Sequence, residues 1–388
     1  MKRQRILFYR IGSLGDSVVS LPALWTIKRN FPDAACYLLE DRQVGNARVS
    51  GSLLFEGSGI FVGEINYAVD SSLLGRFLKP VRLFVLLWRL RRGRFDAVAY
   101  LAPSARKPEQ VARDRFFFRL AGIKRMFGAA GFKDGRASTM PPPREDREAD
   151  QILGRLVYDG LTLPAPGDGS FELFLGPTEE HKVAAWLTSL PPDGGRDWMG
   201  LGPSTKQPAT LWPEERFTDV VARLIVQRDI WPVVFGGAED RDLGDRLILI
   251  WGRGYNACGA LGLREAASAL KHCRLYLGND SGTLHLAASV GVACVGIYSA
   301  HNAEGKWEPY GPGHLVFRKK IDCEGCGLMV CNERRNECIL AVQVDEVAEG
   351  CGRMLSAAKV GPGSSVREVI ESGNASNDLY CHGRGMGE

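Results

Sequence analysis

The sequence predicts an α/β protein built from two doubly wound domains that face each other across a central cleft. At 388 residues the chain is too long for one ordinary hydrophobic core. Short apolar runs alternate with helical patterns in both halves, which is typical of parallel sheets with crossover helices. Polar turns containing glycine follow several of these runs, and in open α/β sheets such turns lie at the edge where ligands bind.

Composition sets the broad class. Hydrophobic residues at 45% and charged residues at 24% are typical of a soluble globular protein. A net charge of +4 is too small to indicate nucleic-acid binding, although it suits an anionic substrate or an anionic membrane surface. The sequence shows no signal peptide and no apolar stretch of roughly 20 residues, and its ten cysteines are mostly scattered. These features predict a protein of the reducing cytoplasm.

The first half opens with a β-α-β pattern. Residues 6–9 are predicted to form a strand, residues 10–16 a glycine turn, and the following residues a helix before a second strand at 36–40. Asp16 stands where the helix begins, at the sheet edge. A carboxylate there could act as a general base, whereas its spacing alone favours a helix cap. The turn lacks Gly-x-Gly-x-x-Gly, so the pattern does not favour a nicotinamide cofactor.

The rest of the first half continues the alternation. Residues 45–63 are predicted to form a loop, and residues 73–92 a basic amphipathic helix. That helix either faces the core with a solvated basic side or contacts a membrane surface. A strand at 95–101 then brings Arg106 and Lys107 to the same edge as Asp16.

Pro- and Gly-rich residues 164–177, with a predicted strand at 171–175, mark the passage between domains. We therefore expect an N-terminal domain over 1–176, a C-terminal domain over 177–358 and a flexible tail over 359–388, where Gly, Ser and Asn dominate. Within the second domain the predicted strands cover 198–202, 231–235, 274–277 and 292–298, and the predicted helices cover 213–227 and 263–272.

The most informative motif is residues 278–289, where a buried strand, a small polar turn and a helix follow one another. Such a turn can bind phosphate or pyrophosphate, because it presents free backbone N–H groups and the positive end of the helix dipole. Thr205 and Lys206 follow another strand and should reach the same edge, where they would supplement these N–H groups. The alternative is structural: Asp280 or Ser281 caps the helix and His285 packs. The nucleoside-triphosphate loop motif is absent.

Four cysteines form a C-x2-C-x4-C-x6-C cluster near the end of the second domain: Cys323, Cys326, Cys331 and Cys338. Four thiolates this close in sequence could hold a structural Zn or Fe ion. The alternative is that the four cysteines are reduced thiols in a folded loop and bind no metal.

Four segments, taken together, resemble the lipopolysaccharide heptosyltransferases of glycosyltransferase family 9. They are residues 11–24, 211–214, 235–239 and 279–288, in the family's order, and the resemblance spans residues 5–355. The cysteine cluster is similar to one that many members carry. The resemblance implies a GT-B fold, that is, two facing Rossmann-like domains with the acceptor on the N-terminal one and the donor on the C-terminal one. It also implies an inverting reaction that needs no metal or other cofactor.

Roles for individual residues follow from the same resemblance. Asp16 would deprotonate the acceptor hydroxyl, Glu239 would reach the nucleotide ribose and Leu261 would lie against the base. The turn at Ser281 and Gly282, with Thr205 and Lys206, would stabilise the charge on the departing diphosphate. Asp280, Thr283 and His285 complete the donor-binding set. The anionic acceptor would meet Arg10, Ser13, Arg106 and Lys107.

The implied partners are ADP-heptose and an inner-core lipopolysaccharide acceptor, with peripheral contact at the cytoplasmic face of the inner membrane and no nucleic acid. Many members carry a lysine two residues before the Trp-Pro pair, where this chain has Thr210. This departure leaves room for a UDP- or GDP-linked sugar, with Lys206 as the substitute lysine in the ADP case. A sugar-nucleotide-binding relative without activity and an oxidoreductase are the remaining alternatives.

Overall fold

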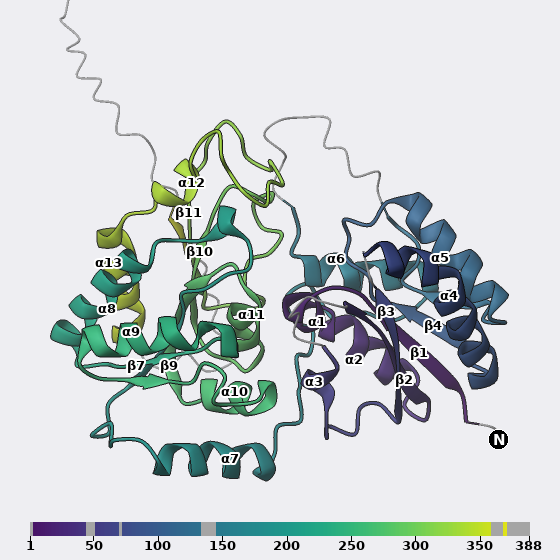
Figure 1. Cartoon of the computed structure of the whole chain (residues 1–388), viewed down its shortest axis with the longest axis horizontal. Coiled ribbons are helices and arrows are strands. Elements are labelled where there is room, and N and C mark those ends of the chain that lie inside the picture. Colours follow the sequence, from purple (N-terminus) through teal and green to yellow (C-terminus); the bar gives the residue numbers. More distant parts are fainter. Residues whose placement is uncertain (1–2, 44–50, 70–71, 133–144, 358–367, 371–388) are drawn as a thin grey trace, which may run out of the picture.

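The computed structural model describes residues 3–43, 51–69, 72–132, 145–357 and 368–370. Two parallel sheets, each covered by helices on both faces, lie beside each other and form two domains (Figure 1). This is the α/β architecture that the alternating pattern predicts.

The N-terminal sheet has the strand order β3-β2-β1-β4-β5. Side chains of its central strand alternate between two cores, because successive residues of a strand point to opposite faces. Ile6 and Phe8 pack with α2 and α6, whereas Leu7 and Tyr9 pack with α4 and α5. The strands are β1 (Arg5–Arg10), β2 (Ala35–Gln43), β3 (Gly63–Val69), β4 (Ala97–Tyr100) and β5 (Arg125–Phe127); the helices are α1 (Leu14–Val19), α2 (Leu21–Asn30), α3 (Ser52–Phe55), α4 (Leu73–Gly93), α5 (Pro108–Leu120), α6 (Glu148–Gly154) and the 3₁₀ helix η1 (Arg155–Asp159).

The C-terminal sheet has the order β12-β11-β10-β9-β6-β7-β8, again all parallel. Helices α10 and α11 pack on one face and α8, α9 and α13 on the other. The strands are β6 (Trp198–Gly202), β7 (Trp231–Val234), β8 (Tyr255–Asn256), β9 (Cys273–Asn279), β10 (Cys294–Tyr298), β11 (Leu315–Arg318) and β12 (Glu368–Ile370). The helices are α7 (Pro177–Thr188), η2 (Pro208–Thr210), α8 (Glu214–Arg228), η3 (Ala238–Asp240), α9 (Arg241–Trp251), α10 (Leu263–Leu270), α11 (Gly282–Ser289), α12 (Glu337–Leu340) and α13 (Val344–Ser356).

One buried cluster runs through both domains, since it contains Ile6 and Phe8 of β1 together with Leu284 and Leu286 of α11. The domains are also tied by backbone hydrogen bonds, from Glu145 N to Glu304 O (2.8 Å) and from Glu148 N to Lys306 O (2.7 Å). The cleft is therefore held in shape by contacts at its sides.

Arg264 of α10 ties the domains at a third point. Its guanidinium donates to Leu54 O (3.0 Å) of the N-terminal domain and to Leu173 O (2.9 Å) and Phe174 O (2.8 Å) of the connecting segment. It also pairs with Glu179 (2.6 Å) of α7. The strand predicted at 171–175 is wrong, because these carbonyls bond to Arg264 and Phe174 has a positive φ of 48°.

Three further predictions differ from the structure. The helix expected after Asp16 is two helices that meet at Ser20, with Pro22 in the first turn of α2. The expected loop at 45–63 contains α3, although residues 44–50 lie outside the described part. Residues 368–370 of the expected tail form β12, and the rest of 359–388 is not among the described residues. None of the described helices combines the length and apolar character needed to cross a bilayer.

Candidate functional site

A cavity of about 550 Å³ opens between the two domains. Its lining comes from the segments that follow β1, β4, β6, β7, β9, β10 and β11, so it lies at the carboxyl edges of both sheets. The turns meet there because parallel strands end at one edge. The cavity therefore occupies the place in the fold where ligands of open α/β proteins bind.

Two helix N-termini face this cavity, that of α1 from the N-terminal domain and that of α11 from the C-terminal domain. Their N-cap residues, Ser13 and Ser281, both line it. The first backbone N–H groups of a helix have no partner within the helix. The site thus presents hydrogen-bond donors and positive dipole ends from both sides, which favours an anionic ligand.

Asp16 lies at the third position of α1 and lines the cavity. Its Oδ2 accepts hydrogen bonds from the Ser13 backbone N–H (2.6 Å) and from the Ser13 hydroxyl (2.9 Å). Gly12 has a φ of +118°, and a Cβ there would collide with this carboxylate. Asp16 is therefore both part of the helix cap and a fixed carboxylate at the wall of the cavity.

The turn before α11 carries a chain of hydroxyl groups. The Tyr276 hydroxyl donates to Thr283 Oγ1 (2.7 Å), which lies 3.0 Å from Ser281 Oγ. Burial raises the pKa of Tyr276, so its hydroxyl stays protonated and can act as this donor. The chain fixes Ser281 and Thr283 at the start of the helix, beside Gly282.

Asp280 and His285 stand at the back of the turn, with Asp280 Oδ1 3.9 Å from His285 Nε2. Burial raises the pKa of Asp280 to about 7 against the opposing effect of Arg318. Burial, helped by His314, lowers the pKa of His285 to about 4. His285 is therefore neutral at pH 7, and the two residues do not form an ion pair there.

Asn279 connects the α11 turn to the loop after β6. Its side chain is fully buried, donates to Pro203 O (2.7 Å) and accepts from the Trp212 backbone N–H (3.0 Å). This arrangement fixes both ends of the loop that carries Thr205 and Lys206 to the cavity.

Thr210 is buried. It occupies the position at which many members of the family that this sequence resembles have lysine. Its hydroxyl lies 3.1 Å from Thr205 Oγ1 and donates to Gln207 O. It is not among the residues that line the cavity. Lys206 is half-exposed and lies 3.8 Å from Glu239 across the cavity wall.

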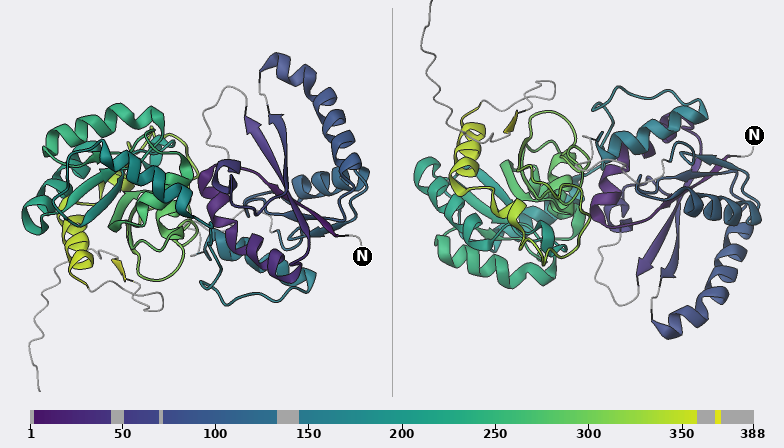
Figure 2. Two further views of the ribbon diagram at one scale, coloured as in Figure 1. Left: turned by 90° about the horizontal axis from the view of Figure 1, so that it is seen from below. Right: turned by 90° about the horizontal axis from the view of Figure 1, so that it is seen from above.

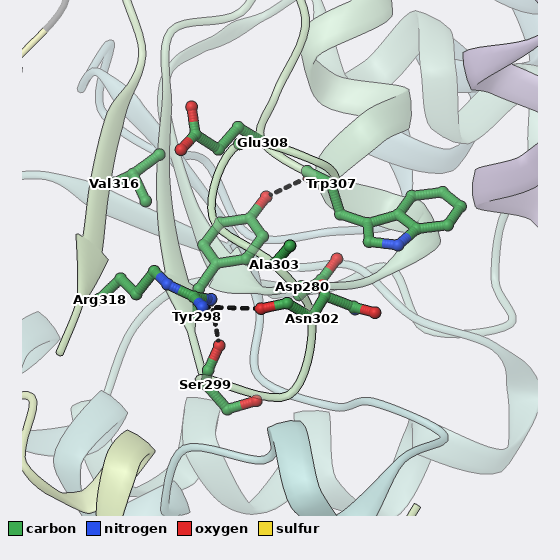
Figure 3. A pocket seen from close by; sticks show the side chains of 10 residues that line it. Asp280, Tyr298, Ser299, Asn302, Ala303, Trp307, Glu308, Val316 and Arg318 are labelled. Atoms are coloured by element: carbon green, nitrogen blue, oxygen red, sulfur yellow. Dashed lines mark hydrogen bonds between the residues drawn. The ribbon is translucent and has the colours of Figure 1, made fainter. Parts of the chain in front are cut away.

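The loop after β10 supplies a wall of the cavity that no motif in the sequence indicates. Arg318 holds this loop by donating to Ser299 O and Asn302 O, both at 2.7 Å (Figure 3). Asp280 lies between the main cavity and a second cavity of about 10 Å³ beside this loop. Four residues of this wall line the cavity but are not among the predicted site residues: His301, Asn302, Lys306 and Trp307. The same is true of four residues on other loops: Gln207, Gly236, Gly237 and Asp240.

The structure brings nearly all the predicted donor residues and two acceptor-side residues to this cavity. They are Ser13, Asp16, Thr205, Lys206, Glu239, Asp280, Ser281, Gly282, Thr283 and His285. Four predicted residues do not line it: Arg10, Arg106, Lys107 and Leu261.

Each of these four has another environment. Arg10 is buried, pairs with Glu40 and donates to the carbonyls of the β1–α1 turn. Arg106 pairs with Asp114 and donates to the Tyr100 hydroxyl (2.8 Å). Lys107 is the exposed N-cap of α5, and Leu261 packs against the shared core cluster.

The four clustered cysteines line a separate small cavity together with Arg334 and Glu337. Burial raises the pKa of the Cys323 and Cys338 thiols. Within the described part of the chain, no three Cys, His, Asp or Glu side chains are arranged to hold a metal ion. As arranged here, the cluster therefore does not fit the structural Zn or Fe site that its spacing suggests.

The sequence model described as glycosyltransferase family 9 (heptosyltransferase) matches residues 172–336. Lipopolysaccharide heptosyltransferase 2 of Salmonella typhimurium is 28% identical over 111 residues, which cover 26% of this chain and 31% of that protein. Lipopolysaccharide heptosyltransferase 2 of Escherichia coli is 27% identical over 111 residues, which again cover 26% of this chain and 31% of that protein. The aligned stretch thus spans about a third of the length of these curated relatives.

Solved structures match almost the whole chain. A family 9 glycosyltransferase from Veillonella parvula has a TM-score of 0.67 and 20% identity, covering 92% of this chain and 98% of its own. ADP-heptose lipopolysaccharide heptosyltransferase II of E. coli has a TM-score of 0.63 and 19% identity, covering 91% and 98%. At these identities the likeness concerns the fold, and it confirms the predicted GT-B arrangement of two facing Rossmann-like domains.

Proposed function

We propose that this chain, whose residues 172–336 match the model of glycosyltransferase family 9, is an inverting glycosyltransferase that moves heptose from ADP-heptose to an inner-core lipopolysaccharide acceptor. One observation carries the proposal. Asp16 from one domain and the N-terminus of α11 from the other line the same cavity. Transfer of the sugar from a nucleotide sugar requires two elements, a general base and a site that binds the anionic leaving group.

The donor side of the proposal rests on the C-terminal wall. The volume of about 550 Å³ suits a nucleotide sugar, since ligand pockets are typically about 300–1,000 Å³. The diphosphate would lie at the α11 N-terminus, with Thr205 and Lys206 beside it. As the bond from the anomeric carbon to the diphosphate breaks, negative charge grows on the leaving group, and fixed N–H dipoles with a nearby cation stabilise that charge.

The acceptor side rests on Asp16. Its carboxylate would take the proton of an acceptor hydroxyl while that oxygen attacks the anomeric carbon from the face opposite the diphosphate. One C–O bond forms as the other breaks, the configuration inverts, and the nucleoside diphosphate leaves with the electron pair. No metal ion takes part in this scheme. Because the acceptor is part of a lipid, we place the reaction at the cytoplasmic face of the inner membrane.

ADP-heptose as donor is supported by the solved relatives, one of which is an E. coli heptosyltransferase with ADP. Thr210 is the observation that favours a second candidate, a different nucleotide sugar. Since Thr210 is buried against Thr205, it does not reach a phosphate from its present position. We assign this task to Lys206, which lies at the cavity wall on the same loop as Thr205.

Calorimetric titration with ADP, UDP and GDP tests the donor. We expect selective binding of ADP, and Lys206→Met should weaken it, whereas Lys271→Met, an exposed lysine away from the cavity, should leave it unchanged. Preference for UDP or GDP would keep the reaction class and replace the sugar nucleotide. Absence of binding to all three would leave a relative without transferase activity. The anomeric configuration of the product, measured by NMR, checks the inverting course.

A further inference from the structure

An exposed apolar stripe runs along α4 on the outside of the N-terminal domain. It consists of Phe77, Val81, Phe84, Val85 and Trp88, whose exposed fractions are 81%, 60%, 68%, 47% and 53%. The spacing i, i+4, i+7, i+8, i+11 puts these side chains on one face of the helix. A contiguous apolar set of this kind is uncommon on a protein that works alone in water.

The stripe is separate from the side of α4 that builds the core. Leu86 and Leu90 are the buried residues of the helix, and they belong to the same cluster as Leu7 and Val98 of the sheet. Burial of α4 against its own domain therefore does not use the stripe. Figure 2 shows α4 at the outer margin of the N-terminal domain, on the side away from the C-terminal domain.

The charged residues of α4 itself are all basic. Between Leu73 and Gly93 the sequence has six basic residues and no Asp or Glu: Arg76, Lys79, Arg82, Arg89, Arg91 and Arg92. The Arg92 guanidinium lies 5.4 Å from the centre of the Trp88 ring, so charge and aromatic surface adjoin.

The neighbouring helix extends this surface. Arg91 Nε donates to Leu120 O (2.8 Å), which joins the C-terminal ends of α4 and α5. On α5, Phe116 and Leu120 are exposed and Arg119 adds further positive charge, whereas Arg113 pairs with Asp114 (3.0 Å).

We propose that this face of α4 is a docking surface for an anionic lipid bilayer. Aromatic and branched apolar side chains can enter the boundary between headgroups and acyl chains while the flanking basic residues meet anionic headgroups. A second copy of the chain is a poor occupant, because the charged residues of α4 are all basic and two such helices would face each other with like charge.

The position of α4 gives the docking surface a consequence for the site. The helix follows β3, which runs parallel to β1 through β2, so α4 begins near the sheet edge that also carries Asp16. A bilayer held against α4 would lie beside the acceptor side of the cleft. This last step rests on the proposed function, whereas the docking surface itself stands on exposure and charge.

Vesicle flotation tests the docking surface. We expect the protein to bind vesicles of phosphatidylglycerol with phosphatidylethanolamine, to bind phosphatidylcholine vesicles far less, and to be released by salt. The double variant Phe77→Glu/Phe84→Glu should lose at least about tenfold in vesicle affinity, since it removes two large apolar side chains from the lipid contact. The matched control is Val226→Glu/Leu249→Glu, two equally exposed apolar residues on α8 and α9 of the other domain, which should bind like the unchanged protein.

Three outcomes would overturn the docking surface. The first is equal vesicle binding by the α4 double variant and the unchanged protein. The second is no preference for anionic vesicles. The third is a dimer in solution that the α4 variant converts to a monomer, because the stripe would then be covered by a second copy. Nucleotide titration of the same variants keeps this test separate from the proposed function, since the α4 substitutions lie outside the cavity.

Discussion

Gly282 of α11 and Gly15 of α1 touch each other across the cleft. A Cβ at Gly282 would lie 3.2 Å from the Gly15 backbone nitrogen and 3.0 Å from Leu14 Cβ. A Cβ at Gly15 would lie 3.7 Å from Gly282 Cα and 3.3 Å from His285 Cδ2. The close approach of the two helix N-termini therefore depends on the absence of a side chain at Gly282, whereas a side chain at Gly15 would crowd His285.

Gly282→Ala should separate the two helix N-termini by a few tenths of an ångström, because the new Cβ would lie only 3.0 Å from Leu14 Cβ and 3.2 Å from the Gly15 backbone nitrogen. Turnover should fall by roughly 10- to 100-fold, since small displacements of reacting groups are costly. The measurement is kcat/KM together with Tm. Gly154→Ala is the control, because a Cβ there meets nothing within 4 Å. Equal kinetics for the two variants would show that the contact does not set the geometry of the site.

Asp16→Asn should reduce kcat by roughly 10²- to 10⁴-fold while ADP binding stays nearly unchanged, because the amide cannot accept the acceptor's proton. Asn retains an oxygen that can accept the Ser13 backbone N–H, so the cap of α1 survives. Ser13→Ala provides the comparison, since it removes the 2.9 Å hydroxyl contact and keeps the carboxylate. If Ser13→Ala is as inactive as Asp16→Asn, Asp16 acts through the cap rather than as the base.

The stability of the fold should depend on pH through Asp280. Burial raises its pKa from 3.8 to about 7, so the folded protein binds more protons than the unfolded chain between these values. Its contribution to the free energy of unfolding therefore falls as pH rises through this window, by at most about 1.4 kcal/mol per pH unit. Asp280→Asn removes this dependence, so the variant should gain stability relative to the unchanged protein from pH 4 to pH 7 in urea unfolding.

His285 should affect the pH dependence of the free energy of unfolding in the opposite direction. Its pKa falls from 6.5 to about 4 on burial, so the folded protein binds fewer protons than the unfolded chain in that range, and stability rises with pH. His285→Gln should therefore lose stability relative to the unchanged protein as pH rises from 4 to 6.5. Parallel trends for the two variants would contradict the assignment of these groups.

Arg264→Met should destabilise the fold by about 3–5 kcal/mol, because it leaves the Glu179 carboxylate buried without its partner. It also leaves Leu54 O, Leu173 O and Phe174 O without this donor. Urea unfolding measures the loss. Arg223→Met breaks the exposed pair with Asp345 and should cost at most about 1 kcal/mol. Similar losses in both variants would mean that the Arg264 contacts do not hold the domains.

The fold and the donor wall could be predicted because their signals are local. A run such as residues 274–277 followed by Asn279-Asp280-Ser281-Gly282 identifies strand, turn and helix within a dozen residues, and the structure has β9 and α11 there. Parallel strands then bring the turns to one edge without further information from the sequence.

The partners of a charged side chain could not be predicted in the same way. The family resemblance implies that Arg10 contacts the acceptor, but Glu40, thirty residues away, lies beside it because β1 and β2 pair in register. Lys306 and Trp307 were missed since they belong to an irregular segment between β10 and β11, where no periodicity indicates which side chains face inward. Phe174 illustrates the reverse error, because an apolar run was assigned to a strand although its carbonyls bond to Arg264.

The core cluster that runs through both domains bears on how the protein is made. The strands β1 to β5 leave the ribosome before α11 exists, and N-terminal domains generally fold first. Leu14, which is buried against Gly282 in the finished structure, then stays open to water during synthesis of the second half. The nascent N-terminal half therefore exposes an apolar surface until the second half has been synthesised. A ribosome stalled before residue 282 would leave a fragment that aggregates or is bound by a chaperone.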